Sequence, residues 1–354
     1  MTRFFKGYAE RREKLTRTVL TRAITFRTKR LIVVLSPGYD WRSGGILSIS
    51  RIYQESVALR HLHRAKVALC TVPGDPFLLK YTWFENRNYL LDLESVLKGC
   101  GSLDYLLLHI PEYAVNRILD WLTSVSPTLM RNVRELQLNV MLQNIDLIQG
   151  QNVSGLKRFG SVTATTAHEA YTKLATREAL GVTLHRLWAC FGPEQYSRSV
   201  YQDKEPLLVV SPDPHPLKKQ LLLQIAKALP ELRIQVIQDL SYEDYKKLIV
   251  RAKWSLTFGE GLDGYFAEPV FSGGVSFAVF NERFFTPAFA GLETVYPSWE
   301  VLVDRIIVDL QRLDEPAAYN QCWQQVYDLL TDQISTDRFR QHLRMFYRGE
   351  YTFP

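Results

Sequence analysis

Two glutamates, Glu260 and Glu268, stand eight positions apart in the segment GEGLDGYFAEPVFSGG (259–274). A carboxylate accepts hydrogen bonds from two hydroxyl groups at once, which suits the vicinal diol of a ribose or of a sugar. The glycines around Glu260 let the backbone approach a ligand closely and expose its amide groups. Because about one such pair is expected by chance in a chain of 354 residues, its meaning depends on the elements that position it.

The surroundings of the pair favour a binding role. The apolar run WSLTF (254–258) predicts a strand that ends just before Glu260, and open α/β sheets bind ligands beyond the carboxyl ends of their strands. Pro269 suits the first turn of a helix, so we expect Glu268 at the amino end of a one-turn helix. The glycine pair 273–274 would end this helix before the next strand. Amide groups at the helix start can also help to hold a phosphate.

The whole chain alternates short apolar runs with helical patterns, and the alternation restarts after a polar stretch at 188–206. Such alternation predicts parallel strands joined by crossover helices, and the chain is long enough for two domains. We therefore expect an α/β fold of two Rossmann-like domains. The predicted strands share an apolar, β-branched character and lie at 30–40, 65–75, 105–111, 132–144, 161–166, 207–214, 233–238, 254–258 and 275–280.

Four segments follow from this pattern. The predicted division is a basic amphipathic leader at 1–29, an N-terminal Rossmann-like domain at 30–195, a C-terminal Rossmann-like domain at 196–330, and a helical segment at 331–354. We expect the N-terminal domain to hold the acceptor and the C-terminal domain to hold the donor of the reaction inferred below.

Composition excludes several classes of protein. The four cysteines are scattered and form no CxxC pair, which argues against a disulfide framework and a zinc site and favours a reducing compartment. No apolar run approaches the roughly 18 residues that span a bilayer, and no secretory signal is apparent. No P-loop is present, and no Asp-x-Asp pair follows a strand. We expect a cytoplasmic protein that uses no metal and no cofactor.

The leader carries most of the net charge. Residues 1–30 contain ten Lys/Arg and two Glu, a local charge of +8, whereas the whole chain carries +6, so the remainder sums to −2. The body of the protein is therefore not a basic nucleic-acid binder. Two interpretations of the leader stay open: a helix that lies on an anionic membrane at the cytoplasmic face, or a solvated basic helix that packs on its own domain.

The segment 259–274 resembles the motif of the group 1 retaining glycosyltransferases of GT-B fold. Their motif runs Glu-x-Phe-Gly-x-x-x-x-Glu, with a glycine five residues later. This chain has Glu260, Leu262 in place of Phe, Asp263 in place of Gly, Glu268, and Gly273 at the fifth position. The resemblance implies two Rossmann-like domains that face a central cleft, with C-terminal helices that cross back.

Further positions of that family can be placed on this chain. A glycine-rich loop after the first strand corresponds to SPGYDWRSGGI, with Gly44 and Gly45. The family's Arg and Lys, which neutralise the donor diphosphate, correspond to Asp213 or Pro214 and to the lysine pair 218–219. The arginine is therefore absent from this chain, and Lys218 or Lys219 would supply the lysine. Similar enzymes place a histidine near the reacting sugar carbon; His109, which we expect at a strand end, takes that position here.

The resemblance implies a hexosyl- or deoxyhexosyltransferase that moves a sugar from a nucleotide-sugar donor to a glycan or lipid-linked glycan, with retention of configuration. It implies Glu260 and His109 at the reacting sugar. The implied donor-binding residues are Lys218, Lys219, Gly261, Asp263, Glu268, Gly44 and Gly45. Surface-polysaccharide synthesis is the role that the family suggests.

Two other interpretations use the same residues. A nucleotide-sugar epimerase would need the donor site but no acceptor. A non-catalytic partner would have lost turnover through the altered loop and the missing arginine, and would bind a sugar nucleotide or a glycan, or stabilise another enzyme.

Overall fold

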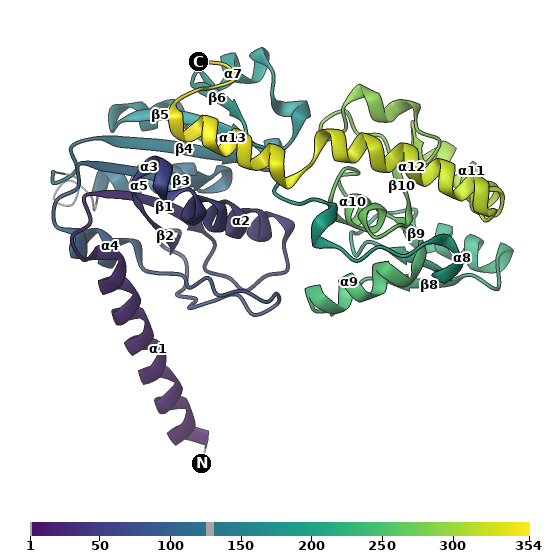
Figure 1. The fold of residues 1–354 in the computed structure, drawn as a ribbon, viewed down its shortest axis with the longest axis horizontal. Coiled ribbons are helices and arrows are strands. Elements are labelled where there is room, and N and C mark those ends of the chain that lie inside the picture. The colour runs from purple at the N-terminus through teal and green to yellow at the C-terminus, as the bar shows by residue number, and fades with distance from the viewer. Residues whose placement is uncertain (1, 125–130) are drawn as a thin grey trace. The chain divides into compact units, whose positions relative to one another are not determined.

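A computed structural model describes residues 2–124 and 131–354 of the chain (Figure 1). The chain forms two compact units: residues 1–189 together with 339–354, and residues 190–338. The sequence pattern had placed the first boundary after residue 195 and the last after residue 330. Each unit is built around its own parallel sheet, and each is described here by itself.

The first unit contains a six-stranded sheet in the order β2-β1-β3-β4-β5-β6, in which every neighbouring pair is parallel. Its strands are β1 (Arg30–Ser36), β2 (Lys66–Thr71), β3 (Tyr105–Pro111), β4 (Leu136–Leu142), β5 (Ser161–Thr166) and β6 (Thr183–Arg186). The predicted strands correspond to β1–β5. The edge strand β6 was not predicted, because its four residues are mostly polar and carry no apolar run.

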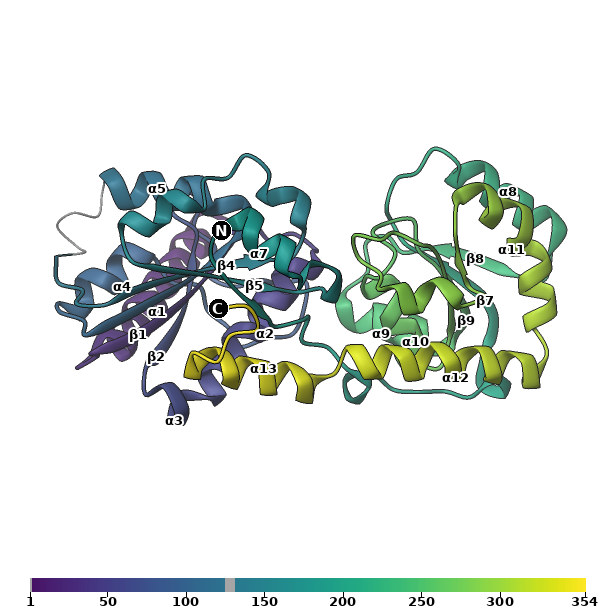
Figure 2. The same cartoon turned by 90° about the horizontal axis from the view of Figure 1, so that it is seen from above.

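Helices cover both faces of this sheet, which explains why β1 and β3 are apolar on both sides. Figure 2 shows α5 and α7 on one face and α2 and α13 on the other. The helices of the first unit are α1 (Thr2–Thr25), α2 (Gly44–Ala58), α3 (Arg60–His63), α4 (Leu93–Cys100), α5 (Val115–Ser124), α7 (Leu174–Leu180) and α13 (Thr336–Arg348).

The second unit contains a five-stranded sheet in the order β11-β10-β9-β7-β8. Its strands are β7 (Glu205–Val210), β8 (Arg233–Val236), β9 (Ala252–Leu256), β10 (Val275–Val279) and β11 (Val295–Tyr296). Its helices are α8 (Lys218–Ala228), α9 (Tyr242–Arg251), α10 (Gly264–Phe271), α11 (Trp299–Leu313) and α12 (Pro316–Gln333). The sequence predicted all of these strands except the two-residue β11.

The C-terminal segment returns to the first unit, as the predicted fold requires. Phe339, Leu343 and Phe346 of α13 are buried. The chain then pairs with the edge strand β6: the amide of Phe353 donates to the carbonyl of Leu184, and the amide of Leu184 donates to that of Phe353, both at 2.9 Å. The tail thus covers an otherwise open sheet edge.

The leader forms the helix α1, which projects from the first unit in Figure 1. Its C-terminal part packs on the core of the first unit through Leu20 and Ile24. Leu15 and Val19 are exposed on another side of the helix. No helix in the described ranges is long and apolar enough to cross a membrane.

Candidate functional site

The glutamate loop lies at the carboxyl edge of the second sheet. Strands β7 and β9 are neighbours, so the loops that follow them, 211–217 and 257–263, meet at this edge. The amide of Phe258 donates to the Ser211 hydroxyl at 2.9 Å, and the Ser211 amide donates to the Leu256 carbonyl at 3.0 Å. This is the edge at which open α/β sheets bind their ligands.

Helix α10 begins four residues earlier than its predicted start. Asp263 is its N-cap: one carboxylate oxygen accepts from the amide of Phe266 and the other from the Thr257 hydroxyl, both at 2.9 Å. An aspartate at the N-cap accepts backbone hydrogen bonds that stabilise the start of a helix. Asp263 supplies these bonds, so it defines where α10 begins, and Pro269 lies inside the helix. The prediction of a one-turn helix with Glu268 at its amino end was therefore wrong, and Glu268 lies in the second turn.

The Glu268 side chain nevertheless reaches the amino end of α10. Its Oε1 lies 3.0 Å from the point that a Cβ atom on Gly264 would occupy, so the side chain folds back over the first residue of the helix. Glu268 is only 7% exposed, and among the described residues its Oε2 has no hydrogen-bond partner. Burial raises the pKa of Glu268 to about 8, against the opposing effect of the nearby hydroxyl groups of Tyr196 and Tyr242.

The half-buried Glu260 lies on a loop whose backbone is fixed by glycine. Gly261 has φ +94°, and a Cβ there would lie 2.5 Å from the ring of Phe285. The next residue, Leu262, is buried, so it fills an apolar position as the family's phenylalanine would. Beyond α10, Gly273 has φ +86° and ends the helix as predicted.

A second pair of carboxylates flanks Gly259. A Cβ at this glycine would lie 2.8 Å from Asp213 Oδ2 and 3.0 Å from Asp263 Oδ2, so the two side chains approach the same point. Asp213 Oδ2 is buried and has no hydrogen-bond partner among the described residues. Burial, with the charges of Asp213 and Glu260, raises the pKa of Asp263 to about 7. This edge is therefore strongly acidic, a property that sequence reasoning missed.

Only one of the two predicted lysines reaches the site. The Lys218 ammonium donates to the carbonyls of Ser211 at 2.5 Å and Asp213 at 2.9 Å, and burial lowers its pKa. Lys219 is exposed and lies with Leu223 and Lys227 on the outer side of α8.

His215 lies in the loop that follows β7, at the same edge of the sheet as Lys218. The ring of His215 lies 4.0 Å from that of Trp299 and 5.6 Å from that of Phe258. It therefore belongs to an aromatic cluster beside Lys218, whose ammonium lies 5.4 Å from the Phe258 ring.

In the first unit, Gly44 and Gly45 open helix α2 after the loop that follows β1, as the sequence predicted. The Gly45 carbonyl accepts from Gln143 Nε2 at 3.2 Å, and a Cβ on Gly45 would lie 2.6 Å from Gln143 Oε1. The loops after β1 and β4 therefore touch at the carboxyl edge of the first sheet. A Cβ on Gly44 would meet nothing within 4 Å, so this glycine leaves open space beside the loop.

His109 is not at a strand end, and that prediction was wrong. It is the fifth residue of the seven-residue strand β3, two positions before the strand ends, and it is 0% exposed. Its Nδ1 lies 2.9 Å from Asn139 Nδ2 and its Nε2 lies 3.4 Å from the Tyr347 hydroxyl. Burial lowers the pKa of His109 to about 3, so the ring is neutral. Its position between the sheet and α13 is that of a structural histidine.

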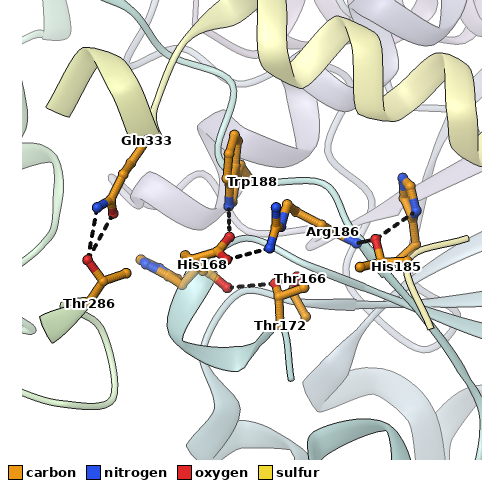
Figure 3. A network of polar contacts seen from close by, with 10 residues as sticks. Thr166, His168, Thr172, His185, Arg186, Trp188, Thr286 and Gln333 are labelled. Carbon is orange, nitrogen blue, oxygen red and sulfur yellow. Dashed lines mark hydrogen bonds and ion pairs between the residues drawn. The ribbon is translucent and has the colours of Figure 1, made fainter. Parts of the chain in front are cut away.

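A polar network orders the carboxyl ends of β5 and β6 (Figure 3). Glu169 accepts from Trp188 Nε1 at 2.9 Å and from Arg186 at 2.5 Å, and the Thr166 hydroxyl lies 2.6 Å from that of Thr172. Nearby, the imidazole Nε2 of His185 lies 2.8 Å from the carbonyl of His342 on α13. These side chains bind one another, so they serve the fold of the first unit.

Figure 3 also shows a pair from the second unit, in which Gln333 donates to the Thr286 hydroxyl at 2.9 Å. This contact ties the last residue of α12 to the loop that precedes β11. Across the described ranges, no cluster of three or more His, Cys, Asp or Glu side chains is arranged to hold a metal ion.

No protein-family model matches the chain, and no curated protein is similar to it in sequence. Solved structures are similar in fold. The Anabaena protein HepE in complex with UDP-glucose has a TM-score of 0.57 and 11% identity, over 90% of this chain and 99% of that chain. Sucrose-phosphate synthase from Thermosynechococcus elongatus has a TM-score of 0.56 and 10% identity, over 90% and 98%.

The likeness extends to WaaG, a glycosyltransferase involved in lipopolysaccharide biosynthesis, with a TM-score of 0.50 and 12% identity over 90% of this chain and 100% of that chain. At such identities the likeness concerns the fold alone. Together with the two parallel sheets, it shows that this chain has the two-domain, Rossmann-like α/β fold of the GT-B class.

Proposed function

We propose that this protein is a glycosyltransferase that moves a hexosyl or deoxyhexosyl group from a nucleotide-sugar donor to a glycan or lipid-linked glycan. The observation that carries the proposal is Glu268, a buried carboxylate with an unpartnered oxygen, folded back to the amino end of α10 beyond the carboxyl end of β9. The similar structures include one that holds UDP-glucose and one named as a glycosyltransferase, which supports a nucleotide sugar as the donor.

Each residue of the site then has a role. Glu268 accepts hydrogen bonds from the two ribose hydroxyl groups of the nucleotide. Glu260 accepts a hydrogen bond from a hydroxyl group of the transferred sugar. The amides around Gly261 and Gly264 and the ammonium of Lys218 stabilise negative charge on the departing diphosphate without a metal. Holding donor and acceptor in this geometry supplies most of the rate enhancement, and the proposed transfer retains the configuration of the sugar.

A nucleotide screen tests the donor site. UDP, GDP, CDP, ADP and dTDP are each added at about 100 times the expected Kd, where a ligand raises stability by about 2.7 kcal/mol. The screen is run at pH 8.5, where Glu268 with its pKa of about 8 is mostly ionised. One nucleotide should raise the Tm of the wild type but not that of Glu268→Ala.

The matched control is Glu112→Ala, which removes another buried carboxylate, one that accepts from the amide of Asn144 in the first unit. It should lower the starting Tm and keep the full nucleotide shift. An equal shift in wild type and Glu268→Ala would refute the assignment of Glu268.

One observation favours a non-catalytic sugar-nucleotide or glycan-binding partner as the second candidate. Asp213 or Pro214 stands where the similar glycosyltransferases have their diphosphate arginine, and Lys218 already donates to two carbonyls. Absence of transfer on a broad donor and acceptor panel, together with a retained nucleotide shift, would support this second candidate.

We also propose that helix α1 places the protein on an anionic membrane, as a lipid-linked acceptor would require. Arg11, Leu15, Val19 and Arg22 follow one another at helical spacing and are all exposed, so one face of α1 is both apolar and basic. Exposed Phe26 continues this face just past the helix end. Such a face matches an anionic lipid surface, whereas two copies of it would repel each other.

Vesicle sedimentation tests this contact. The wild type should sediment with vesicles of phosphatidylcholine containing about 30% phosphatidylglycerol and not with phosphatidylcholine alone. The double variant Leu15→Ser/Val19→Ser should bind the anionic vesicles about tenfold less, because it loses the apolar area that enters the lipid. The control is Leu223→Ser: Leu223 is 63% exposed on the basic helix α8, close to the 65% of Leu15. Equal binding by all three proteins would exclude the α1 face.

A further inference from the structure

One tryptophan of this chain lies apart from the cores. The other six are buried or half-buried, whereas Trp41 is 65% exposed. Its indole stacks on the ring of Tyr39, with ring centroids 5.0 Å apart and planes 20° apart, and Tyr39 is also exposed. Exposed tyrosine and tryptophan side chains, which combine an apolar ring with a polar group, are enriched where proteins bind other molecules.

The aromatic pair sits on a loop that side chains hold in place. Asp40, between the two aromatic residues, accepts from the Thr82 amide at 3.0 and 3.2 Å and from the Thr82 hydroxyl at 2.5 Å. Because Asp40 holds the loop at its tip, little conformational entropy is lost when a ligand packs against it.

The base of the loop is anchored as well. The amide of Gly38 donates to Asp75 at 3.0 Å, and Asp75 is itself held by Arg117 at 2.5 Å. The buried hydroxyl of Tyr81 donates to the Pro37 carbonyl at 2.5 Å. Asp75 and Tyr81 both belong to the long connection between β2 and α4. This connection therefore holds the loop that carries the aromatic pair.

We infer that Tyr39 and Trp41 form a stacking surface for the pyranose rings of a glycan, which rests on the proposed function because that glycan would be the acceptor. The apolar face of a pyranose packs on aromatic rings, and the face of Trp41 turned away from Tyr39 is the surface that remains for it. Arg42, which follows Trp41 in the chain, and Thr82, whose hydroxyl donates to Asp40, are both exposed, and they are polar groups of the kind that bind sugar hydroxyls.

The position of the pair within the first unit fits this ligand. The loop follows β1 and leads into Gly44 and Gly45 at the start of α2. It therefore lies at the carboxyl edge of the first sheet, where open α/β sheets bind their ligands. Two aromatic side chains with a polar rim are too small an apolar area for a stable protein interface, which favours a ligand as small as a sugar.

An array of immobilised α- and β-linked hexose oligosaccharides tests the inference without any donor. Labelled wild-type protein should bind a subset of the glycans, and Trp41→Ala should bind that subset at least tenfold more weakly. Tyr39→Ala should weaken it less, since Trp41 keeps its outer face. The control is Phe77→Ala, which removes an exposed aromatic residue that stacks instead with Arg17 of α1 and should leave binding unchanged.

Two results would overturn the inference: no glycan bound by the wild type, or the same glycans bound equally by Trp41→Ala. The nucleotide screen separates this failure from that of the proposed donor site. Trp41→Ala should keep the full nucleotide shift, and a glycan-binding surface that depends on Trp41 would stand even if no nucleotide bound.

Discussion

Replacing Glu268 with glutamine is expected to raise the Tm of the protein by about 5–10 °C at pH 8.5, although it removes the residue proposed to bind the nucleotide. The pKa of Glu268 is raised from its ordinary value of 4.5 to about 8 because the side chain is buried. At pH 8.5 the wild type must bury a charged carboxylate, and the neutral amide of glutamine avoids that cost. Each pKa unit corresponds to about 1.4 kcal/mol, so this shift sets an upper bound of about 5 kcal/mol. A gain of about 3 kcal/mol already corresponds to this Tm change in a unit of this size.

The sign of the pH dependence follows from the raised pKa. A carboxyl group that binds its proton more tightly in the folded state contributes stability that is complete below pH 4.5 and is lost as the pH rises through about 8. The difference in Tm between Glu268→Gln and wild type should therefore be near zero at pH 4.5 and should grow up to pH 8.5. Asp263, with its pKa of about 7, acts in the same direction in both proteins, and its charge adds to the raised pKa of Glu268 in the wild type.

Scanning calorimetry between pH 4.5 and 9 measures both curves. Glu205→Gln is the matched control of opposite sign, because the hydrogen bond from Arg251 lowers the pKa of Glu205. A lowered pKa contributes stability above the ordinary pKa, so this variant should melt below wild type at pH 8.5. If Glu268→Gln melts below wild type at every pH, the carboxylate is stabilised by its tyrosine neighbours and is not held ready for a ligand.

Such a gain would identify a residue kept for function at the expense of stability. The buried Oε2 of Glu268 has no partner among the described residues, and a ribose diol would supply one. The same substitution should therefore stabilise the free protein and remove the stabilisation that the nucleotide gives, a combination that a purely structural glutamate would not produce.

The fold was largely predictable from the sequence because the signals that define it are local. Apolar runs such as those of β1 and β3 are buried on both faces and read as parallel strands without any knowledge of their neighbours. The strand β6 escaped prediction because its four residues carry no apolar run, and its pairing partner Phe353 lies more than 160 residues away in the chain. Only the folded chain brings these two segments together.

The candidate site was predictable in its residues but not in its electrostatics. Glu260 and Glu268 could be named from their spacing. The start of α10 could not, because either Asp263 or Pro269 could have defined it, and the structure shows that Asp263 is the N-cap. The approach of Asp213 to Asp263 across Gly259 joins two loops that lie some fifty residues apart. No periodicity reports such a contact, and the same is true of the burial of His109 beneath α13.

Replacing Asp213 with arginine is expected to tighten the binding of a nucleoside diphosphate by about 10- to 100-fold, or roughly 1.4–2.8 kcal/mol. The wild-type edge brings Asp213, Asp263 and Glu260 together, and the Lys218 ammonium already donates to two backbone carbonyls. The variant replaces a negative charge beside the diphosphate with a positive one, and an arginine fork can bind two phosphate oxygens. It also removes the charge that helps to raise the pKa of Asp263.

Isothermal titration with the nucleotide found in the screen measures this change, at low and at high salt, because the gain should shrink as salt screens the new charge. The control is Glu231→Arg, which reverses an exposed charge just before β8, at the amino end of the same sheet, and should alter affinity less than twofold. Unchanged or weaker binding by Asp213→Arg would place the diphosphate away from the β7 loop and contradict the proposed roles of Lys218 and the α10 amides.

The outcome also decides between the two candidate functions. If the wild type binds a nucleotide and Asp213→Arg only tightens it, the site works with its aspartate, and weak diphosphate binding would favour rapid release of the product. If the wild type binds none of the five nucleotides and Asp213→Arg binds one, the pocket for base and ribose is intact and the aspartate alone closes it. Such a chain would have lost its donor through a single position, and the non-catalytic partner would then be the better description.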